Sequence, residues 1–379
     1  MPSLNHIVVT GIGLISALGN LNETWESLLQ NKTGIKIQQP FPEIQPLPLA
    51  SISSKIPFSL NKITQTVVKD ALKDAKLTPP LPECGVVIGS SRGFQGAWEN
   101  FMSNKKNSSF AKSPWLDNLP YQSANIAAQI VGSRGIVIAP MAACATSTVA
   151  IARAFELIKM GKCKQVLVGA VESPITPLTL AAFKNVGAMA KTGCYPFSKN
   201  REGLVLGEGG AVFVLETQEY AKKRGANIYG KILGFGLSCD AYHISAPSPS
   251  GKQGQRTLKD CLKRSNLLSN NIQFIHAHGT STLLNDQMEA NLIQSLFPKS
   301  IAVSSTKGAT GHTLGASGSL GLAFSLKALK SQIIPPCIGL TQKEFPLNFP
   351  SQAKPINLQQ VLCFSFGFGG QNGVIAIGN

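Results

Sequence analysis

Two glycine-rich turns, each followed by an apolar strand, place the strongest constraint on the fold of this chain. They are GEGGAVFVLE, residues 207–216, and GFGGQNGVIAIG, residues 367–378. Upstream of each lies a strand-like run, a small-residue turn and a long helical pattern, VIAPMAACATSTVAIARAFELIKMG and AVSSTKGATGHTLGASGSLGLAFSLKALK. Glycine turns are common in loops, so a chance similarity is the alternative. The shared order of strand, turn and helix favours an internal duplication with a boundary near residue 225.

Strand-like runs rich in Val and Ile alternate with helical patterns along both halves, which is typical of strands covered by helices. The predicted strands of the first half are Ile7–Thr10, Val86–Ile88, Ile136–Ala139, Val166–Val168 and Ala211–Leu215. Those of the second half are Tyr229–Leu233, Phe274–His276, Ala302–Ser304, Pro336–Ile338 and Val374–Ile377. We therefore predict an α/β protein with two similar halves, 1–225 and 226–379.

The composition is that of a globular α/β enzyme, because 43% of the residues are hydrophobic and only 14% are charged. The N-terminal residues do not have the pattern of a secretory signal, so we expect a cytoplasmic protein. The stretch from Gly135 to Ala152 is free of charge. Pro140 and three hydroxyl residues interrupt it, so we predict buried core and no membrane span.

Eight cysteines occur without a Cys-x-x-Cys pair or a zinc-like cluster of histidines. This spacing indicates reduced, mostly buried thiols and no metal site. The net charge of +16 favours an acidic partner, which could be nucleic acid, anionic lipid or an acidic protein. The basic runs carry no interleaved aromatic residues and match no nucleic-acid motif, so we expect no nucleic-acid binding.

Cys144 lies where an apolar run turns into a helix. Val149, Ala152, Phe155 and Ile158 fall on one predicted helical face, which places Cys144 at the helix N-terminus. Free N–H groups and the helix dipole at that end would lower the pKa of a thiol and could hold an oxyanion. An isolated cysteine is more often a small buried core residue, and that alternative stays open from this motif alone.

Two of the five histidines lie in glycine-rich turns that follow strands: His278 in HAHGTSTLLND and His312 in TKGATGHTLGASG. An imidazole in such a turn can donate a hydrogen bond to a carbonyl or exchange a proton near neutral pH. Taken singly, either histidine fits a structural role equally well. His276 alternates with His278 along the strand and should face the other way, so we assign it to packing.

Together, ACATS, HGTSTLLND, STKGATGH and FGFGGQNG resemble the four active-site motifs of the elongating β-ketoacyl-acyl carrier protein synthases of the thiolase superfamily. The resemblance runs in the family's order along nearly the whole chain. It implies a thiolase-like duplicated βαβαβαββ fold, layered α-β-α-β-α, and a homodimer. It also implies decarboxylative condensation of an acyl thioester on Cys144 with malonyl carrier protein, which extends the chain by two carbons.

The resemblance also implies a role for each matching residue. Neutral His278 and His312 would bind the malonyl thioester carbonyl, and Lys307 matches the lysine of the catalytic cluster. Backbone N–H groups of Cys144 and Phe368 would form the oxyanion hole, and the Phe368 side chain would act as a gate. Hydroxyls matching Thr280 and Thr282 line the family's pantetheine tunnel, although both residues could simply be β-formers in a turn. No cofactor is implied, because the phosphopantetheine of acyl carrier protein carries the substrates.

The chain departs from the family's pattern at five positions. Gly321 stands where a glutamate is usual, nine residues after the second histidine. The other four departures are Tyr195 for Arg, Ser198 for Asp, Gln371 for Thr and Phe364 for Asn. We expect these changes to surround the acyl pocket and the docking rim, and to alter substrate length and partner.

An acidic acyl carrier protein would suit the basic charge of the chain. Residues 61–76 form a plausible helix with Ile63, Val67, Ala71 and Ala75 inward and four lysines outward, namely Lys62, Lys69, Lys73 and Lys76. Lys62 is the candidate docking residue, and a simple solvated face is the alternative. Two other functions stay open: a chain-length-factor-like subunit that pairs with an active synthase, and a thiolase, which would need a second catalytic cysteine.

Overall fold

The computed structural model describes residues 6–103 and 115–379. The first half contains the strands β1 (Ile7–Ser16), β2 (Gly19–Asn20), β3 (Lys36–Gln38), β4 (Leu47–Leu49), β5 (Gly85–Gly89), β6 (Val137–Ile138), β7 (Gln165–Glu172) and β8 (Gly209–Thr217). Its helices are α1 (Leu21–Leu29), α2 (Leu60–Asp74), α3 (Gln95–Ser103), α4 (Gln122–Val131), α5 (Thr146–Lys159), α6 (Pro177–Asn185) and α7 (Gln218–Lys223).

The second half has a similar content. Its strands are β9 (Gly230–Cys239), β10 (Phe274–His276), β11 (Ala302–Ser304), β12 (Ile333–Ile334), β13 (Lys354–Pro355), β14 (Gln360–Gly367) and β15 (Gln371–Gly378). Its α-helices are α8 (Lys252–Ser265), α9 (Leu283–Leu296), α10 (Lys307–Thr310) and α11 (Ser317–Ser331). Short 3-10 turns include η4 (Leu314–Ala316) and η5 (Phe368–Gly370).

The two halves repeat one sheet topology. The strands of the first half neighbour one another in the order β1-β8-β7-β5-β6, and those of the second in the order β9-β15-β14-β10-β11. In both series the first three strands are antiparallel and the last three are parallel. The series meet where the start of β1 pairs with the start of β9. This repeat confirms the predicted α/β fold. The boundary near residue 225 falls between α7 and β9, and the division there stays a prediction.

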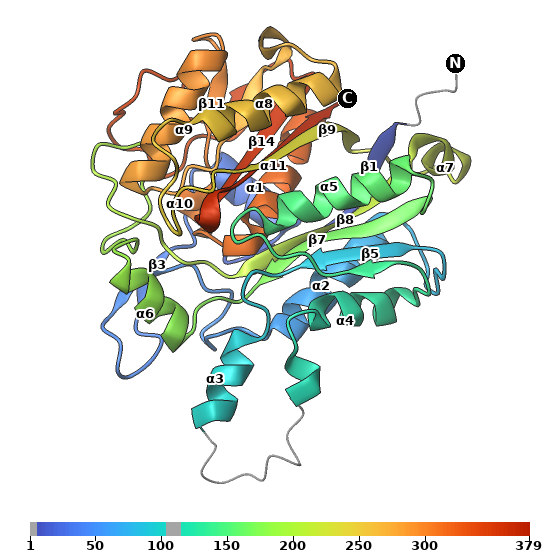
Figure 1. Cartoon of the computed structure of the whole chain (residues 1–379), viewed down its shortest axis with the longest axis horizontal. Helices are drawn as coiled ribbons and strands as arrows, with labels where there is room; N and C mark the ends of the chain where they lie inside the picture. Colours follow the sequence, from blue (N-terminus) through green and yellow to red (C-terminus); the bar gives the residue numbers. More distant parts are fainter. Residues whose placement is uncertain (1–5, 104–114) are drawn as a thin grey trace.

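Helices and sheets form five layers, α-β-α-β-α, as expected. α5 and α11 pack together in the middle and contact strands of both series. α2 and α4 cover the outer face of the first series, and α8 covers that of the second, as Figure 1 shows. A central apolar cluster lies around α5 and α11, and one further cluster lies under each outer helix layer. The ends of both strand series are thereby brought to one region of the molecule.

The predicted helix over residues 61–76 is confirmed as α2. Its inward residues Ile63, Val67, Ala71 and Ala75 are buried, and its lysines are exposed. Burying a side chain such as Ile63 or Val67 stabilises the fold by about 1.5–3 kcal/mol, which explains why this face sets the orientation of the helix.

Three expectations for single elements were wrong. Pro336–Ile338 is not a strand, because Pro336 has no N–H for a ladder, and the strand in that region is β12. β14 was not predicted, since its sequence ends in the glycine-rich turn that dominated the pattern. The stretch after Gly135 is not all core, because Ile136, just before the edge strand β6, and Val137, the first residue of β6, are exposed. α5 itself is buried on more than one face. None of the helices among the described residues is long and apolar enough to span a membrane.

Candidate active site

Cys144 lies in a tight turn between β6 and α5. The hydroxyl of Thr146 accepts from the N–H of Ala142 at 2.9 Å and donates to the carbonyl of Ala143 at 2.7 Å. Ala143 has a φ of 46°, in the left-handed region that non-glycine residues rarely adopt. Ser365 on β14 donates to the Cys144 carbonyl at 2.9 Å. The turn is thus held from both halves of the protein, with the cysteine two residues before the helix begins.

The thiol of Cys144 is not acidified as expected. Burial raises the pKa of Cys144 to about 11, and the Phe368 N–H that donates to its sulfur and the charge of Lys307 offset this only in part. Cys144 is 6% exposed, so the loss of hydration of a thiolate outweighs the stabilising groups nearby. The prediction that the helix N-terminus lowers this pKa is therefore wrong for the free protein.

His278 follows β10 and is fixed through its backbone and through Lys307. The Lys307 ammonium donates to the His278 carbonyl and lies 3.4 Å from the ring Nδ1. An ammonium can donate hydrogen bonds but cannot accept them, so Nδ1 of His278 is the acceptor. The neutral ring therefore carries its hydrogen on Nε2. Burial and the charge of Lys307 hold the pKa of His278 well below its usual range.

His312 precedes η4 and is held in the same tautomer. Its Nδ1 accepts from the Leu314 N–H at 3.1 Å and lies 2.8 Å from the Ser317 hydroxyl. Nε2 therefore carries the hydrogen of the neutral ring. Burial, with a smaller contribution from the charge of Lys307, keeps the pKa of His312 well below its usual range.

The structure brings Cys144, His278 and His312 together from three separate loops. The Cys144 sulfur and one nitrogen of each imidazole all lie within 4.8 Å of one another. The two rings are perpendicular, with centroids 5.3 Å apart. Cysteine and histidine are ligands that zinc prefers, but the Lys307 ammonium beside His278 disfavours a second cation. The arrangement suits a nucleophilic sulfur with two neutral N–H donors aimed at one point.

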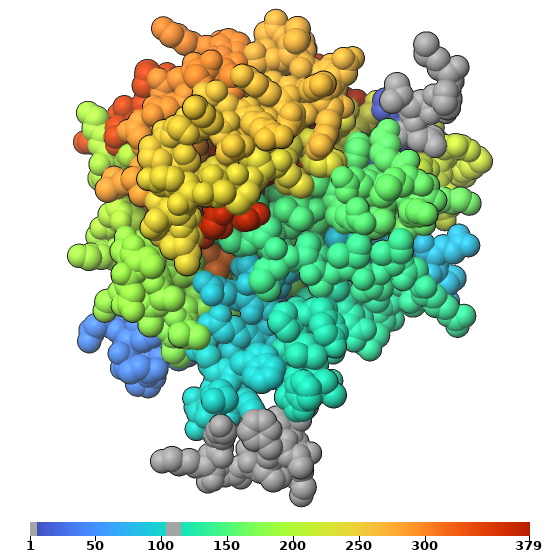
Figure 2. Space-filling model, viewed as in Figure 1, coloured from blue at the N-terminus to red at the C-terminus, as the bar shows by residue number. Residues whose placement is uncertain are grey.

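A cavity of about 250 Å³ contains this cluster, with Cys144, His278 and His312 among its lining residues. Phe368 also lines it and stacks on Phe183 with centroids 5.6 Å apart. In Figure 2 red C-terminal atoms are visible in a hollow beside the yellow segment that follows β9. The hollow connects the cluster with the surface, so a thioester on a long flexible arm could reach the sulfur.

Thr280 and Thr282 both line the cavity, and their hydroxyls lie 2.8 Å apart. They belong to the turn between β10 and α9, which needs unusual backbone angles: Gly279 has a φ of 44° and Ser281 a φ of 69°. A Cβ at Gly279 would lie 2.6 Å from the side chain of Ser305, so only glycine fits there. The turn is therefore rigid where it presents hydroxyls to the cavity.

Acidic residues on α9 that sequence reasoning missed support this turn. Glu289 accepts from the N–H groups of His278 and Gly279 at 2.6 and 2.7 Å. Asp286 accepts from the Phe197 and Ser281 N–H groups at 2.8 and 3.2 Å. The available signal was their spacing of three residues, which puts both carboxylates on one face of the helix that follows the histidine turn.

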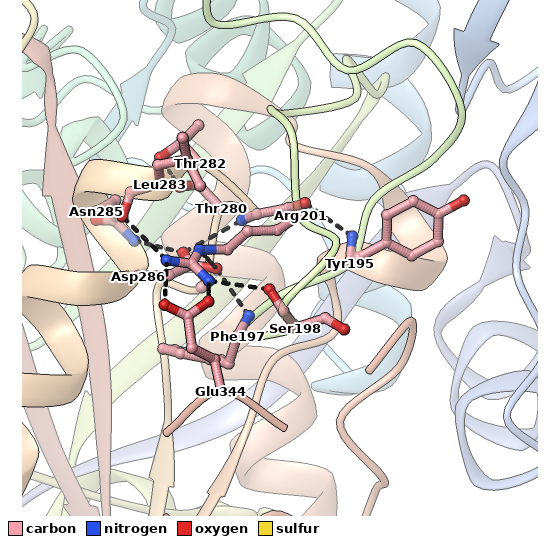
Figure 3. Close-up of polar contacts among 12 residues, drawn as sticks. Tyr195, Phe197, Ser198, Arg201, Thr280, Thr282, Leu283, Asn285, Asp286 and Glu344 are labelled. Atoms are coloured by element: carbon pink, nitrogen blue, oxygen red, sulfur yellow. Dashed lines mark hydrogen bonds and ion pairs between the residues drawn. The ribbon is translucent and has the colours of Figure 1, made fainter. Parts of the chain in front are cut away.

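Arg201 is a second group that the sequence reasoning missed. Figure 3 shows its guanidinium between Asp286 and Glu344. The guanidinium also donates to the carbonyl of Ser198 at 2.9 Å. The side chain is almost fully buried and lies over the ring of Phe345. This ion network ties the segment after Tyr195 to the turn that carries Thr280.

Glu172, at the end of β7, is a third missed residue. It is fully buried and accepts hydrogen bonds from Ser90, Ser91, Arg92 and Gly315. The Gly315 N–H belongs to η4, three residues after His312. A buried carboxylate with several N–H and O–H donors is a strong local anchor, and this one joins the loop after β5 to the His312 turn.

The five departures from the family's pattern do not line the cavity directly. Tyr195, Ser198, Gly321, Phe364 and Gln371 are not among the residues that line the cavity. Phe364 is buried in the outer core of the second half, and Ser198 bonds to Asn200 and to the Gln342 carbonyl. Gln371 nevertheless lies between two lining residues, Gly370 and Asn372, and the expectation that these changes surround the acyl pocket and the docking rim stays a prediction. Lys62 is exposed on α2 and also lies outside the cavity lining.

Comparisons with known proteins agree with this geometry. Two family models match the chain, the N-terminal domain of β-ketoacyl synthase over residues 60–221 and the C-terminal domain over residues 229–341. The 3-oxoacyl-[acyl-carrier-protein] synthase 2 of Staphylococcus aureus is 33% identical over 99% of this chain and 98% of that protein.

Solved structures are also similar over almost the full length. A β-ketoacyl synthase from Burkholderia phymatum is 27% identical, with a TM-score of 0.91 over 99% of this chain and 100% of that chain. A chain of a type II polyketide ketosynthase complex with its acyl-carrier protein is 26% identical, with a TM-score of 0.92 and 99% of both chains covered. Sequence, fold and the Cys-His-His geometry agree, and the chain belongs to the β-ketoacyl synthase family.

Proposed function

We propose that the protein is a β-ketoacyl-acyl carrier protein synthase that condenses an acyl group on Cys144 with malonyl carrier protein. The observation that carries this proposal is the cluster itself: one sulfur and one nitrogen of each of two neutral imidazoles lie within 4.8 Å of one another, in a cavity that leads to the surface. The product would be a β-ketoacyl chain two carbons longer than the starting acyl group, for fatty acid or polyketide biosynthesis.

In the first step, the Cys144 sulfur attacks the carbonyl of an acyl thioester. A carbon–sulfur bond forms to Cys144, the bond to the carrier breaks, and the thiol proton leaves with the carrier sulfur. The Phe368 N–H donates to the Cys144 sulfur. Together with the N–H of Cys144, it would bind the developing oxyanion. Glycine at 367 keeps this region open, since a Cβ there would lie 3.0 Å from the Cys144 nitrogen.

In the second step, the malonyl thioester loses carbon dioxide. The electrons of the broken carbon–carbon bond form an enolate, whose oxygen accepts from Nε2–H of His278 and of His312. The enolate carbon attacks the acyl carbonyl on Cys144, and collapse of the intermediate releases the Cys144 thiolate and the β-ketoacyl carrier protein. Depressed pKa values keep both imidazoles neutral, and the donors to their Nδ1 atoms leave the hydrogen on Nε2. Lys307 fixes the tautomer of His278.

The proposed reaction needs no metal or organic cofactor, because the carrier's phosphopantetheine delivers both substrates. An acyl carrier protein is the expected partner, and a solved neighbour is described as a ketosynthase complex with its carrier. Thr280 and Thr282 would contact the pantetheine arm in the cavity. Docking through Lys62 and a cytoplasmic location both stay predictions.

The edge of the sheet supports the proposed dimer. β6 is the last strand of its series, and its neighbours Ile136 and Met141 are 36% and 59% exposed. An apolar edge strand is a site for pairing with another chain. A second copy, or a second synthase-like subunit, would cover this edge. Light scattering of the purified protein should give twice the chain mass of 40.1 kDa if the protein is a homodimer.

The direct test mixes the protein with acyl carrier protein and malonyl carrier protein. Mass spectrometry should find an acyl group on Cys144 and a carrier-bound chain two carbons longer. The Cys144→Ala variant is the control and should form neither species. The alternative, a chain-length-factor-like subunit, predicts activity only after a second synthase is added. A structure described as a ketosynthase/chain length factor is 26% identical to this chain, but the complete cluster favours an active enzyme.

A further inference from the structure

His276 makes a polar contact within the core. Its ring is 3% exposed, and its Nε2 lies 3.1 Å from the hydroxyl of Thr306, the residue before Lys307. Among the described residues its Nδ1 has no hydrogen-bond partner. An apolar side chain would fill this place without leaving a buried nitrogen unpaired, so packing alone is a poor explanation for a histidine here.

Gly321 makes room for this ring. α11 passes directly over β10, and a Cβ at position 321 would lie 2.8 Å from both Nδ1 and Cε1 of His276. No real side chain fits at such a distance unless the ring moves. This explains why the chain has no glutamate at position 321: the His276 ring, which comes from β10, occupies the space that the glutamate side chain would need. His276 and Gly321 act as one complementary pair.

The pair lies beside the catalytic cluster. Thr306 precedes the short helix α10, whose first residue, Lys307, carries the ammonium that contacts His278. The hydrogen bond between His276 and Thr306 therefore holds the start of the segment that orients Lys307. Burial lowers the pKa of Lys307, and the nearby carboxyl group of Glu289 is the neighbour that offsets this most.

We propose that His276 is a positioning residue that, through Thr306, fixes Lys307 against His278, from a space that Gly321 keeps open. This inference rests on the proposed function, since Lys307 matters only if His278 binds the malonyl carbonyl. The turn of Cys144 is held by hydrogen bonds of Thr146 and Ser365, whereas the hydrogen bond of His276 is made with Thr306. Loss of His276 should thus impair decarboxylation and leave acylation of Cys144 intact.

The test separates these two half-reactions. His276→Phe keeps the ring volume and removes both nitrogens, whereas His276→Gln keeps a polar group that can reach Thr306. We expect His276→Phe to acylate Cys144 within twofold of wild type and to decarboxylate malonyl carrier protein on the order of ten- to a hundredfold more slowly, with an unchanged KM. His276→Gln should recover most of the rate. His6→Phe, at an exposed histidine, is the matched control.

A second test substitutes Gly321, which lies against the ring of His276. Gly321→Glu should destabilise the protein, and adding His276→Ala should offset much of that loss, because the two substitutions share one space. The inference is overturned if His276→Phe slows both half-reactions equally or decarboxylates at the wild-type rate. It is also overturned if the effects of Gly321→Glu and His276→Ala on stability are additive. If the wild-type protein acylates Cys144 and decarboxylates malonyl carrier protein, the proposed function is supported whatever the variants do. If the wild-type protein carries out neither half-reaction, both proposals are overturned.

Discussion

Replacing Glu172 by Gln should destabilise the protein and misplace His312. The two carboxylate oxygens accept five hydrogen bonds: Oε1 from the Ser90 hydroxyl at 2.7 Å and the Arg92 N–H at 3.1 Å, and Oε2 from the Ser91 N–H at 2.9 Å, the Ser91 hydroxyl at 2.6 Å and the Gly315 N–H at 3.0 Å. An amide keeps one acceptor oxygen, and its NH₂ group then faces the Arg92 N–H, which cannot turn away.

The expected cost follows from these bonds. Hydrogen bonds to a charged group contribute about 1.5–3 kcal/mol each, and a buried unpaired donor costs about 1–3 kcal/mol. The amide would keep the three bonds to one oxygen, and the Ser90 hydroxyl can rotate. We therefore expect Glu172→Gln to lower the free energy of unfolding by about 2–4 kcal/mol. The bond to the Gly315 N–H, three residues after His312, is kept but weakened, because its acceptor loses its charge. Decarboxylation should therefore also slow more than acylation of Cys144.

Urea unfolding of wild type, Glu172→Gln and Glu219→Gln measures this change. Glu219 is an exposed glutamate paired with Lys223, so its variant should unfold like wild type. The charge of Glu172 also raises the pKa of the Cys144 thiol, so alkylation of Cys144 should become faster in Glu172→Gln. A loss of less than about 0.5 kcal/mol, within the range of ordinary surface changes, would refute the anchoring role of this carboxylate.

Three further predictions follow from the site. Because burial raises the pKa of Cys144 to about 11, its alkylation by iodoacetamide should rise about tenfold per pH unit up to about pH 9, and a plateau at lower pH would contradict this. Gly367→Ala should slow acylation on the order of a hundredfold in single-turnover assays, because its Cβ would lie 3.0 Å from the Cys144 nitrogen. Arg201→Met should lower the free energy of unfolding by about 3–5 kcal/mol, because Asp286 stays buried without its cation, and Glu344→Gln should cost less in the same assay.

Much of the fold and the membership of the site could be read from the sequence. Alternating strand and helix patterns, repeated in two halves, are local signals, and the observed strand series follow them. The turns around Cys144, His278 and His312 carry local glycine and small-residue signals, so these residues could be named in advance. Elements with mixed local signals, such as β14, were not predicted from the sequence, because an apolar run and a glycine-rich turn overlap there.

The properties that decide the chemistry depend on neighbours that are distant along the chain. The tautomer of His278 comes from Lys307, the pKa of Cys144 is raised by desolvation, and Glu172 anchors a turn of the other half. The absence of a side chain at Gly321 has meaning only because His276 fills that space. The order of residues by itself determined which groups could react, through local turns and periodicity. Tertiary structure alone decided their charge, tautomer and mutual distance, since burial and electrostatic interactions act through space.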